Sequence, residues 1–363
     1  MFFFTIIIFL LFLEFILRNY FEYLDEVSKT NNIKRVPDLA LQRNYHINSS
    51  TDENTNSQFD KELGWKLKGN TDLKVKVEAP YIKESLNYNY KVNSFGARSD
   101  NFSGNKKTLG FFGCSITYGH GLNEASTFAN QICKQKVEYE YLNYGVAGYS
   151  LYQSLLSFKE RIKKIKFDKV IFTIHEDQQR RNTSSLSWLK IINRVWAVPG
   201  IIYFNGLKIK IKPRKYFRLF NTNIRLIYLI EFLINFLFSG IGDLKQIKKQ
   251  TNEHLLMEIK KVCDSNNIEL IILCLDNFKN LNDFLNKNSF NWNIPGVNLN
   301  ETNQKGECKW QLMPWDNHPN EQANQIFATK ILEVIDSKKR PFKPKVKFFK
   351  NQKNPQEYIY PIY

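Results

Sequence analysis

The chain has 363 residues, a length that suits one large domain or two modest ones. Hydrophobic residues make up 43% and charged residues 24%, which excludes wholesale disorder, and 52 basic against 35 acidic residues give a net charge of +17. The five cysteines are scattered and form no CxxC pair, so we expect no disulfide framework, no metal and no cofactor.

An apolar run opens the chain. Residues 2–17 read FFFTIIIFLLFLEFIL, and extension to Phe21 gives the roughly 20 residues that a membrane span takes. Glu14 and Arg18 are four residues apart, so on a helix they partly neutralise each other. We therefore expect residues 1–21 to form an uncleaved membrane anchor. The alternatives are a cleaved signal peptide and a buried core helix.

Short β signatures follow a polar linker. Residues 22–59 are rich in Asn, Ser and Thr, which is typical of a linker. Apolar residues then alternate over 73–77, which predicts a strand, and a second short strand is expected over 88–92. Residues 60–104 are therefore predicted to form a small β preface to the main domain.

Buried strands alternate with helices over the main domain, residues 105–337. The strands are predicted over residues 108–113, 139–142, 170–174 and 268–275, and the helices over residues 128–136, 151–165, 254–266 and 319–337. Ser126 is expected to be the N-cap of the first of these helices. This alternation indicates an α/β fold with a central parallel sheet.

An insertion of residues 180–250 interrupts this pattern. Asn205-Gly206 between β-forming residues predicts a hairpin. The apolar stretch over 224–238 is too short and too punctuated by polar residues for a second membrane span. We interpret it as a lid helix packed on the core, with contact to a membrane surface as the alternative.

The tail, residues 338–363, is basic. Between Lys338 and Lys353 it has eight Lys or Arg and no acidic residue. We interpret it as a solvated tail, and its functional alternative is attraction to anionic lipid headgroups. No helix-turn-helix, zinc finger or aromatic RNA-binding motif accompanies the charge, so no nucleic-acid partner is predicted.

A candidate nucleophile follows the first strand of the main domain. The segment 110–119 reads GFFGCSITYG and places Ser115 where α/β folds display residues to ligands. The neighbouring glycines permit a tight turn with exposed backbone N–H groups, which can stabilise an oxyanion. Cys114 is interpreted as a small buried packing residue.

Two further segments accompany this serine. Residues 143–150 read NYGVAGYS, and residues 316–320 read DNHPN just before the last helix. The order of these pieces resembles the SGNH/GDSL hydrolase family, and DKELGW and VNSFGARSD are similar to the preface of its membrane-anchored members. The resemblance covers about residues 60–180 and 250–337, and it implies a three-layer, flavodoxin-like parallel sheet.

The resemblance also implies roles for individual residues. Ser115 matches the family's nucleophile and, together with Gly148, provides backbone donors of the oxyanion hole. His318 matches the general base, and Asp316 matches the carboxylate that orients it. The family usually has this Asp three residues before the His, where this chain has Trp315.

The third family motif departs from the pattern. Where the family has Gly-x-Asn-Asp, residues 174–177 read Ile-His-Glu-Asp, so Glu176 replaces the asparagine that donates to the oxyanion. An ionised carboxylate would repel that charge. Three interpretations stay open: His175, Gln178 or Asn182 supplies the donor, two backbone donors suffice, or hydrolysis has been lost.

Four polar residues are candidates for the rim of the site: His120, His175, Glu176 and Asp177. His120 is interpreted chiefly as an exposed loop histidine, with a rim contact to substrate as the alternative. For His175, a role at the rim or oxyanion and a structural hydrogen bond are weighed equally.

The resemblance implies a serine ester hydrolase that removes an O-acyl group, acetyl first, from cell-surface carbohydrate or another acylated small molecule. The alternatives are an O-acetyltransferase and a non-catalytic carbohydrate-binding or scaffold protein. Analogy with the family favours a domain on the periplasmic or outer face of a membrane. The basic residues after the apolar run, Arg18 and Lys29, favour the cytoplasmic side instead.

Overall fold

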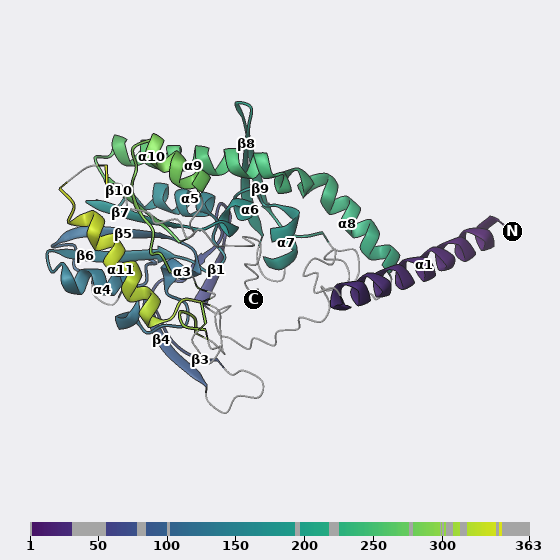
Figure 1. The fold of residues 1–363 in the computed structure, drawn as a ribbon, viewed down its shortest axis with the longest axis horizontal. Coiled ribbons are helices and arrows are strands. Elements are labelled where there is room, and N and C mark those ends of the chain that lie inside the picture. The colour runs from purple at the N-terminus through teal and green to yellow at the C-terminus, as the bar shows by residue number, and fades with distance from the viewer. Residues whose placement is uncertain are drawn as a thin grey trace. The chain divides into compact units, whose positions relative to one another are not determined.

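The computed structural model describes most of the chain, and Figure 1 shows its elements. The described residues are 2–30, 56–77, 85–99, 102–192, 197–217, 225–275, 279–297, 299, 301–302, 308–312, 318–338 and 341–342. They fall into two compact units. The first draws on residues 1–50 and 216–241, and the second on residues 51–215 and 242–362.

A five-stranded parallel sheet forms the centre of the second unit. Its strands are β5 (Lys107–Gly113), β6 (Tyr139–Gly145), β7 (Lys169–Ile174), β10 (Glu269–Cys274) and β11 (Asn291–Asn293). They lie in the order β11-β10-β7-β5-β6, and each neighbouring pair is parallel. This is the flavodoxin-like order, in which the chain reverses direction across the sheet between β5 and β7. The predicted α/β fold with a parallel sheet is confirmed.

Helices cover both faces of this sheet, which makes three layers (Figure 1). One face carries α5 (Leu151–Arg161), α9 (Lys245–Ser265) and α10 (Lys279–Lys287), and the other carries α4 (Phe128–Gln135) and α11 (Glu321–Ile335). Successive strand residues point to opposite faces. In β5, Phe112 therefore packs with the first set of helices and Phe111 with the second.

The first turn of α4 corrects one detail of the sequence analysis. Thr127, not Ser126, is the N-cap, and its side chain accepts the backbone N–H of Asn130 at 3.3 Å. Residues Glu124–Ser126 form a 3-10 turn, η1, whose last residue cannot also start the helix. The N-cap is therefore one residue later than predicted, whereas the helix begins at Phe128, as predicted.

Two antiparallel pairs make up the preface. β3 (Thr71–Val77) pairs with β4 (Leu86–Val92), as the two predicted strands required. β1 (Ser57–Asp60) pairs with β2 (Gly64–Leu67), and the sequence analysis did not predict this pair. Both strands of the second pair are short, and alternation over four residues gives too weak a pattern to detect.

The insertion begins with two short helices and a hairpin. Its elements are α6 (Asp177–Asn182), α7 (Leu186–Ile192), β8 (Val198–Phe204), β9 (Leu207–Arg214), α8 (Arg225–Ser239) and the 3-10 turn η2 (Gly240–Asp243). Asn205 and Gly206 have φ angles of +47° and +81°, as a two-residue turn with two left-handed positions requires. The hairpin prediction is confirmed.

The first unit pairs two helices that are distant in sequence. α1 (Phe2–Thr30) lies beside α8, and the Glu14 carboxylate accepts the backbone N–H of Leu226 at 2.8 Å. Glu14 also pairs with Arg18 at 3.3 Å. The carboxylate therefore satisfies a free N–H at the start of α8 as well as a charge on its own helix.

The predicted membrane anchor is not supported. Among the described residues, no helix is long and apolar enough to cross a membrane. Most of the predicted linker, 22–59, and of the basic tail, 338–363, lies outside the described residues.

Candidate active site

Ser115 is the first residue of a short helix that begins one residue after the end of strand β5. This helix, α3, spans Ser115–Tyr118. A Cβ atom at Gly113 would collide with the hydroxyl of Thr117, so only glycine lets the chain turn back this sharply from strand to helix. The N–H of the first helical residue has no partner within the helix. Among the described residues no hydrogen bond uses the Ser115 N–H, which leaves it open as a donor.

His318 reaches this serine from the far end of the chain. Its Nε2 lies 2.7 Å from Ser115 Oγ. The backbone around it is fixed because the Leu312 N–H donates to the His318 carbonyl at 2.9 Å, and Asn320 is the N-cap of α11. Asp316, the expected orienting carboxylate, lies outside the described residues.

The loop after β6 is held in a strained conformation by the preface. Gly148 has φ +76°, where a side chain would be strained. The indole N–H of Trp65 donates to the carbonyl of Ala147 at 3.1 Å. Because a trans peptide points its C=O and N–H in opposite directions, the Gly148 N–H faces away from that indole. No hydrogen bond among the described residues uses this N–H.

A buried arginine fixes the other end of the nucleophile helix. Arg98 donates to the carbonyls of Tyr118 and Gly119, each at 2.8 Å, and of Leu122 at 2.5 Å. Its Nε pairs with the Glu124 carboxylate at 2.7 Å. Carbonyls at a helix C-terminus lack helical partners, so a cation there both satisfies and orients them. The turn that presents the nucleophile is thus held from both sides.

His175 lies under the nucleophile turn. It follows β7 and is buried, and its Nε2 is 3.3 Å from the Sγ of Cys114. Burial, aided by the nearby Arg181, lowers the pKa of His175 to about 3, so the ring is neutral at neutral pH. Cys114 is 1% exposed, which confirms the prediction of a buried packing residue.

The two acidic residues of the altered motif differ in their surroundings. The side chain of Glu176 is exposed. Asp177 pairs with Arg180 and with Arg181, whose Nη2 lies at 2.5 Å. Burial alone would raise the pKa of Asp177, but the two guanidinium groups hold it well below its usual range. Partial burial nevertheless raises the pKa of the Glu176 carboxyl, and Asp177 is neutralised by its two partners, so both effects weaken the repulsion expected for an oxyanion.

His120 is buried, and the interpretation as an exposed loop histidine is wrong. It is 4% exposed, and its ring centroid lies 4.5 Å from that of His318. Its backbone N–H donates to the Ser115 carbonyl at 3.1 Å, so the turn after α3 brings the imidazole back over the site. Tyr88 of the preface packs edge-on against it at 5.9 Å.

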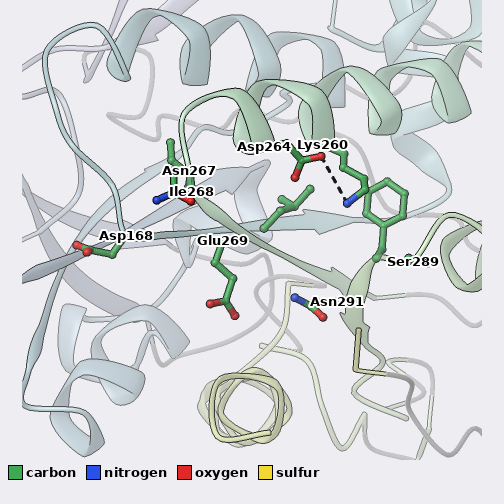
Figure 2. Close-up of a pocket in the computed structure, with 10 residues that line it drawn as sticks. Asp168, Lys260, Asp264, Asn267, Ile268, Glu269, Ser289 and Asn291 are labelled. Carbon is green, nitrogen blue, oxygen red and sulfur yellow. Dashed lines mark ion pairs between the residues drawn. The ribbon is translucent and has the colours of Figure 1, made fainter. Parts of the chain in front are cut away.

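The pocket drawn in Figure 2 lies at the amino ends of strands β7 and β10. It is lined by Asp168, Lys260, Asp264, Asn267, Ile268, Glu269, Leu270, Ser289, Phe290 and Asn291. Asp168 and Glu269 stand at the amino ends of β7 and β10, whereas Ser115 follows the carboxyl end of β5. Lys260 and Asp264 form an ion pair across 3.7 Å. This pocket is therefore separate from the nucleophile, and we assign it no catalytic role.

Sequence reasoning missed Trp65 and Arg98 as members of the site. Both stand in the segments that resemble the family preface, DKELGW and VNSFGARSD, but nothing in the local pattern showed what they touch. The indole reaches a carbonyl 82 residues away, and the guanidinium reaches carbonyls 20 to 24 residues away. Only the similarity of these segments to the family preface indicated that they contribute to the site.

No family model matches the chain, and no curated protein matches it. Solved structures similar to it include a GDSL-like lipase from Bacteroides thetaiotaomicron, 12% identical, with 66% of this chain and 92% of that chain covered and a TM-score of 0.35. A member of the lipolytic G-D-S-L family from Veillonella parvula is 13% identical, with 63% and 97% covered and a TM-score of 0.36. A psychrotrophic esterase from Pseudoalteromonas is 10% identical, with 63% and 97% covered and a TM-score of 0.35.

Proposed function

We propose that this chain is a serine ester hydrolase of the SGNH type. The observation behind the proposal is the 2.7 Å contact between His318 Nε2 and Ser115 Oγ. A serine hydroxyl is a poor nucleophile until a base takes its proton, and a neutral imidazole at hydrogen-bond distance is suited to do so. The two residues are 203 positions apart, so the contact is a product of the fold and not of a local turn.

The reaction follows from the placement of these groups. Ser115 Oγ attacks the ester carbonyl carbon while His318 takes the hydroxyl proton. The carbonyl oxygen becomes an oxyanion and accepts from the backbone N–H groups of Ser115 and Gly148. The intermediate collapses, the alcohol leaves with the proton from His318, and water attacks the acyl-enzyme by the same route. We assign Asp316 the role of orienting the imidazole.

The acyl group in this proposal is short, acetyl above all. The choice of acetyl as the acyl group, of carbohydrate as the alcohol and of the cell surface as the location rests on the family resemblance alone.

Hydrolysis of p-nitrophenyl esters tests the proposal. We expect the full-length protein to hydrolyse the acetate faster than the butyrate. Ser115→Ala and His318→Ala should each lower kcat for the acetate by at least about 10³-fold, because each removes a group needed in the same step. Equal, near-background rates in the wild type and both variants would refute the proposed esterase.

A further inference from the structure

We propose that the side-chain amide of Gln178 is the third oxyanion donor of this site. It would replace the asparagine of the family motif, whose position Glu176 occupies. The inference rests on the proposed esterase function. Gln178 lies on α6, only 1% exposed, and its Nε2 has no hydrogen-bond partner among the described residues.

An unpartnered amide N–H in the interior is unfavourable, because the group has lost water and gained nothing in return. The other end of the same amide is fixed: Gln178 Oε1 accepts the backbone N–H of His175 at 3.3 Å. The hydrogen bond at Oε1 therefore fixes the orientation of the amide, while its Nε2 has no acceptor. A substrate oxygen could accept from this N–H group.

Gln178 is linked to the nucleophile turn through His175. Gln178 is bonded to His175, and the imidazole of His175 contacts Cys114, the residue before Ser115. The amide is thus two contacts away from the turn that presents the nucleophile and its open N–H.

The helix α6 also lies beside the second oxyanion loop. Arg181 stands one turn after Gln178, so both side chains lie on the same side of the helix. Arg181 Nη1 donates to the carbonyl of Tyr149, the residue after Gly148, at 3.4 Å. The helix that carries Gln178 therefore also contacts the segment that supplies the second backbone donor.

The other candidates from the sequence are already engaged. Asn182 Oδ1 accepts the Tyr152 N–H at 3.0 Å, and Asn182 Nδ2 donates to Asn252 at 3.2 Å. The Nε2 of His175 contacts Cys114. Asn182 is therefore engaged at both ends of its amide and His175 contacts Cys114, whereas Gln178 Nε2 has no partner among the described residues.

Trp188 is the alternative candidate for the third oxyanion donor. It is 3% exposed, its indole N–H has no partner among the described residues, and its Cζ2 lies 3.7 Å from the position of a Cβ at Gly148. The ring stacks under the guanidinium of Arg181 at 4.4 Å, which explains its place without a substrate contact. The experiment separates the two donors.

The proposed role makes a kinetic prediction. A neutral amide transfers no proton, and it binds the oxygen more tightly once that oxygen carries negative charge. In the full-length protein, Gln178→Met keeps the length of the side chain and removes the N–H. We expect kcat for p-nitrophenyl acetate to fall by about 10²- to 10³-fold, with KM within about threefold. The neighbour on the same helix, Gln179→Met, is the matched control and should stay within about twofold of the wild type.

Gln178→Glu distinguishes a donor from a positioning residue. It keeps an oxygen for the His175 N–H but replaces the donor with an acceptor. If Gln178 is a donor, kcat of Gln178→Glu at pH 8 should fall at least as much as kcat of Gln178→Met. If Gln178 only positions other residues, kcat of Gln178→Glu should be close to that of the wild type. Thermal unfolding of each variant shows whether the fold persists, and kcat is compared among variants that stay folded at the assay temperature.

Two results would overturn the inference. One is a Gln178→Met enzyme within about threefold of the wild type, with or without a large loss in Trp188→Phe. The other is near-normal turnover of Gln178→Glu at pH 8. If the wild type itself shows no Ser115-dependent turnover, the proposed function fails and this inference fails with it. An active wild type with an unaffected Gln178→Met overturns this inference alone.

Discussion

Burial of His175 couples the stability of the fold to pH. The pKa of its ring is about 3 in the folded chain and about 6.5 in an unfolded one. Between these two values the unfolded chain binds a proton that the folded chain does not. The free energy of unfolding therefore decreases as the pH falls through this window, and this contribution is fully regained above about pH 6.5.

His175→Asn should flatten this dependence. The change removes the group that titrates, so the free energy of unfolding should depend less on pH between pH 6 and 4. The slope of the variant should be smaller than that of the wild type by up to about 1.4 kcal/mol per pH unit. Urea unfolding of both proteins at three pH values gives the two slopes. Equal slopes would show that the imidazole is protonated in the folded chain as readily as in the unfolded one. Loss of the contact with Cys114 should also lower stability at pH 7.

At the scale of elements, the preface braces the nucleophile helix through one buried ion pair. Arg98 is fully buried and Glu124 nearly so. In Arg98→Met the carboxylate would stay buried without its charge partner, and three carbonyls would lose their donor. We expect the free energy of unfolding, measured by urea denaturation, to fall by about 3 to 5 kcal/mol. Adding Glu124→Gln should recover part of this loss, and a double variant less stable than the single one would contradict the account.

The preface also braces the oxyanion loop through the indole N–H of Trp65, which donates to the Ala147 carbonyl. Trp65→Phe keeps an aromatic ring but removes the bond to the Ala147 carbonyl, so the Gly148 peptide should be less well oriented. We expect kcat for p-nitrophenyl acetate to fall about tenfold and stability by about 1 kcal/mol. Trp292→Phe is the control, because that indole donates at the same 3.1 Å to Asn286 instead. Equal kcat losses in the two variants would disprove a specific role for Trp65.

At the scale of the molecule, every described group assigned to the site belongs to the second unit. Residues 1–50 belong to the first unit, with α8. Deletion of residues 1–50 should therefore leave kcat/KM for p-nitrophenyl acetate within about twofold of the full chain. It should also lower solubility, because α8 would lose its partner helix and expose apolar residues. Loss of turnover in a soluble, folded deletion variant would show that the first unit contributes to the site.

The sheet could be predicted because buried parallel strands consist of short apolar runs, such as residues 108–113 and 170–174. Ser115 and His318 were predictable because short motifs mark the ends of a strand and the start of a helix. The burial of His120 could not be predicted from the sequence, because it depends on a left-handed turn after α3. The contact of Trp65 with the oxyanion loop could not be predicted either, because long-range contacts leave no periodic pattern in the sequence.

The most direct test of the proposed serine hydrolase is covalent. The full-length protein would be treated with a fluorophosphonate probe, digested, and the labelled peptide identified by mass spectrometry. We predict one adduct on Ser115, absent in Ser115→Ala and slowed by at least about 10³-fold in His318→Ala. No adduct on Ser115, or labelling at the same rate in wild type and His318→Ala, would contradict the assignment of nucleophile and base.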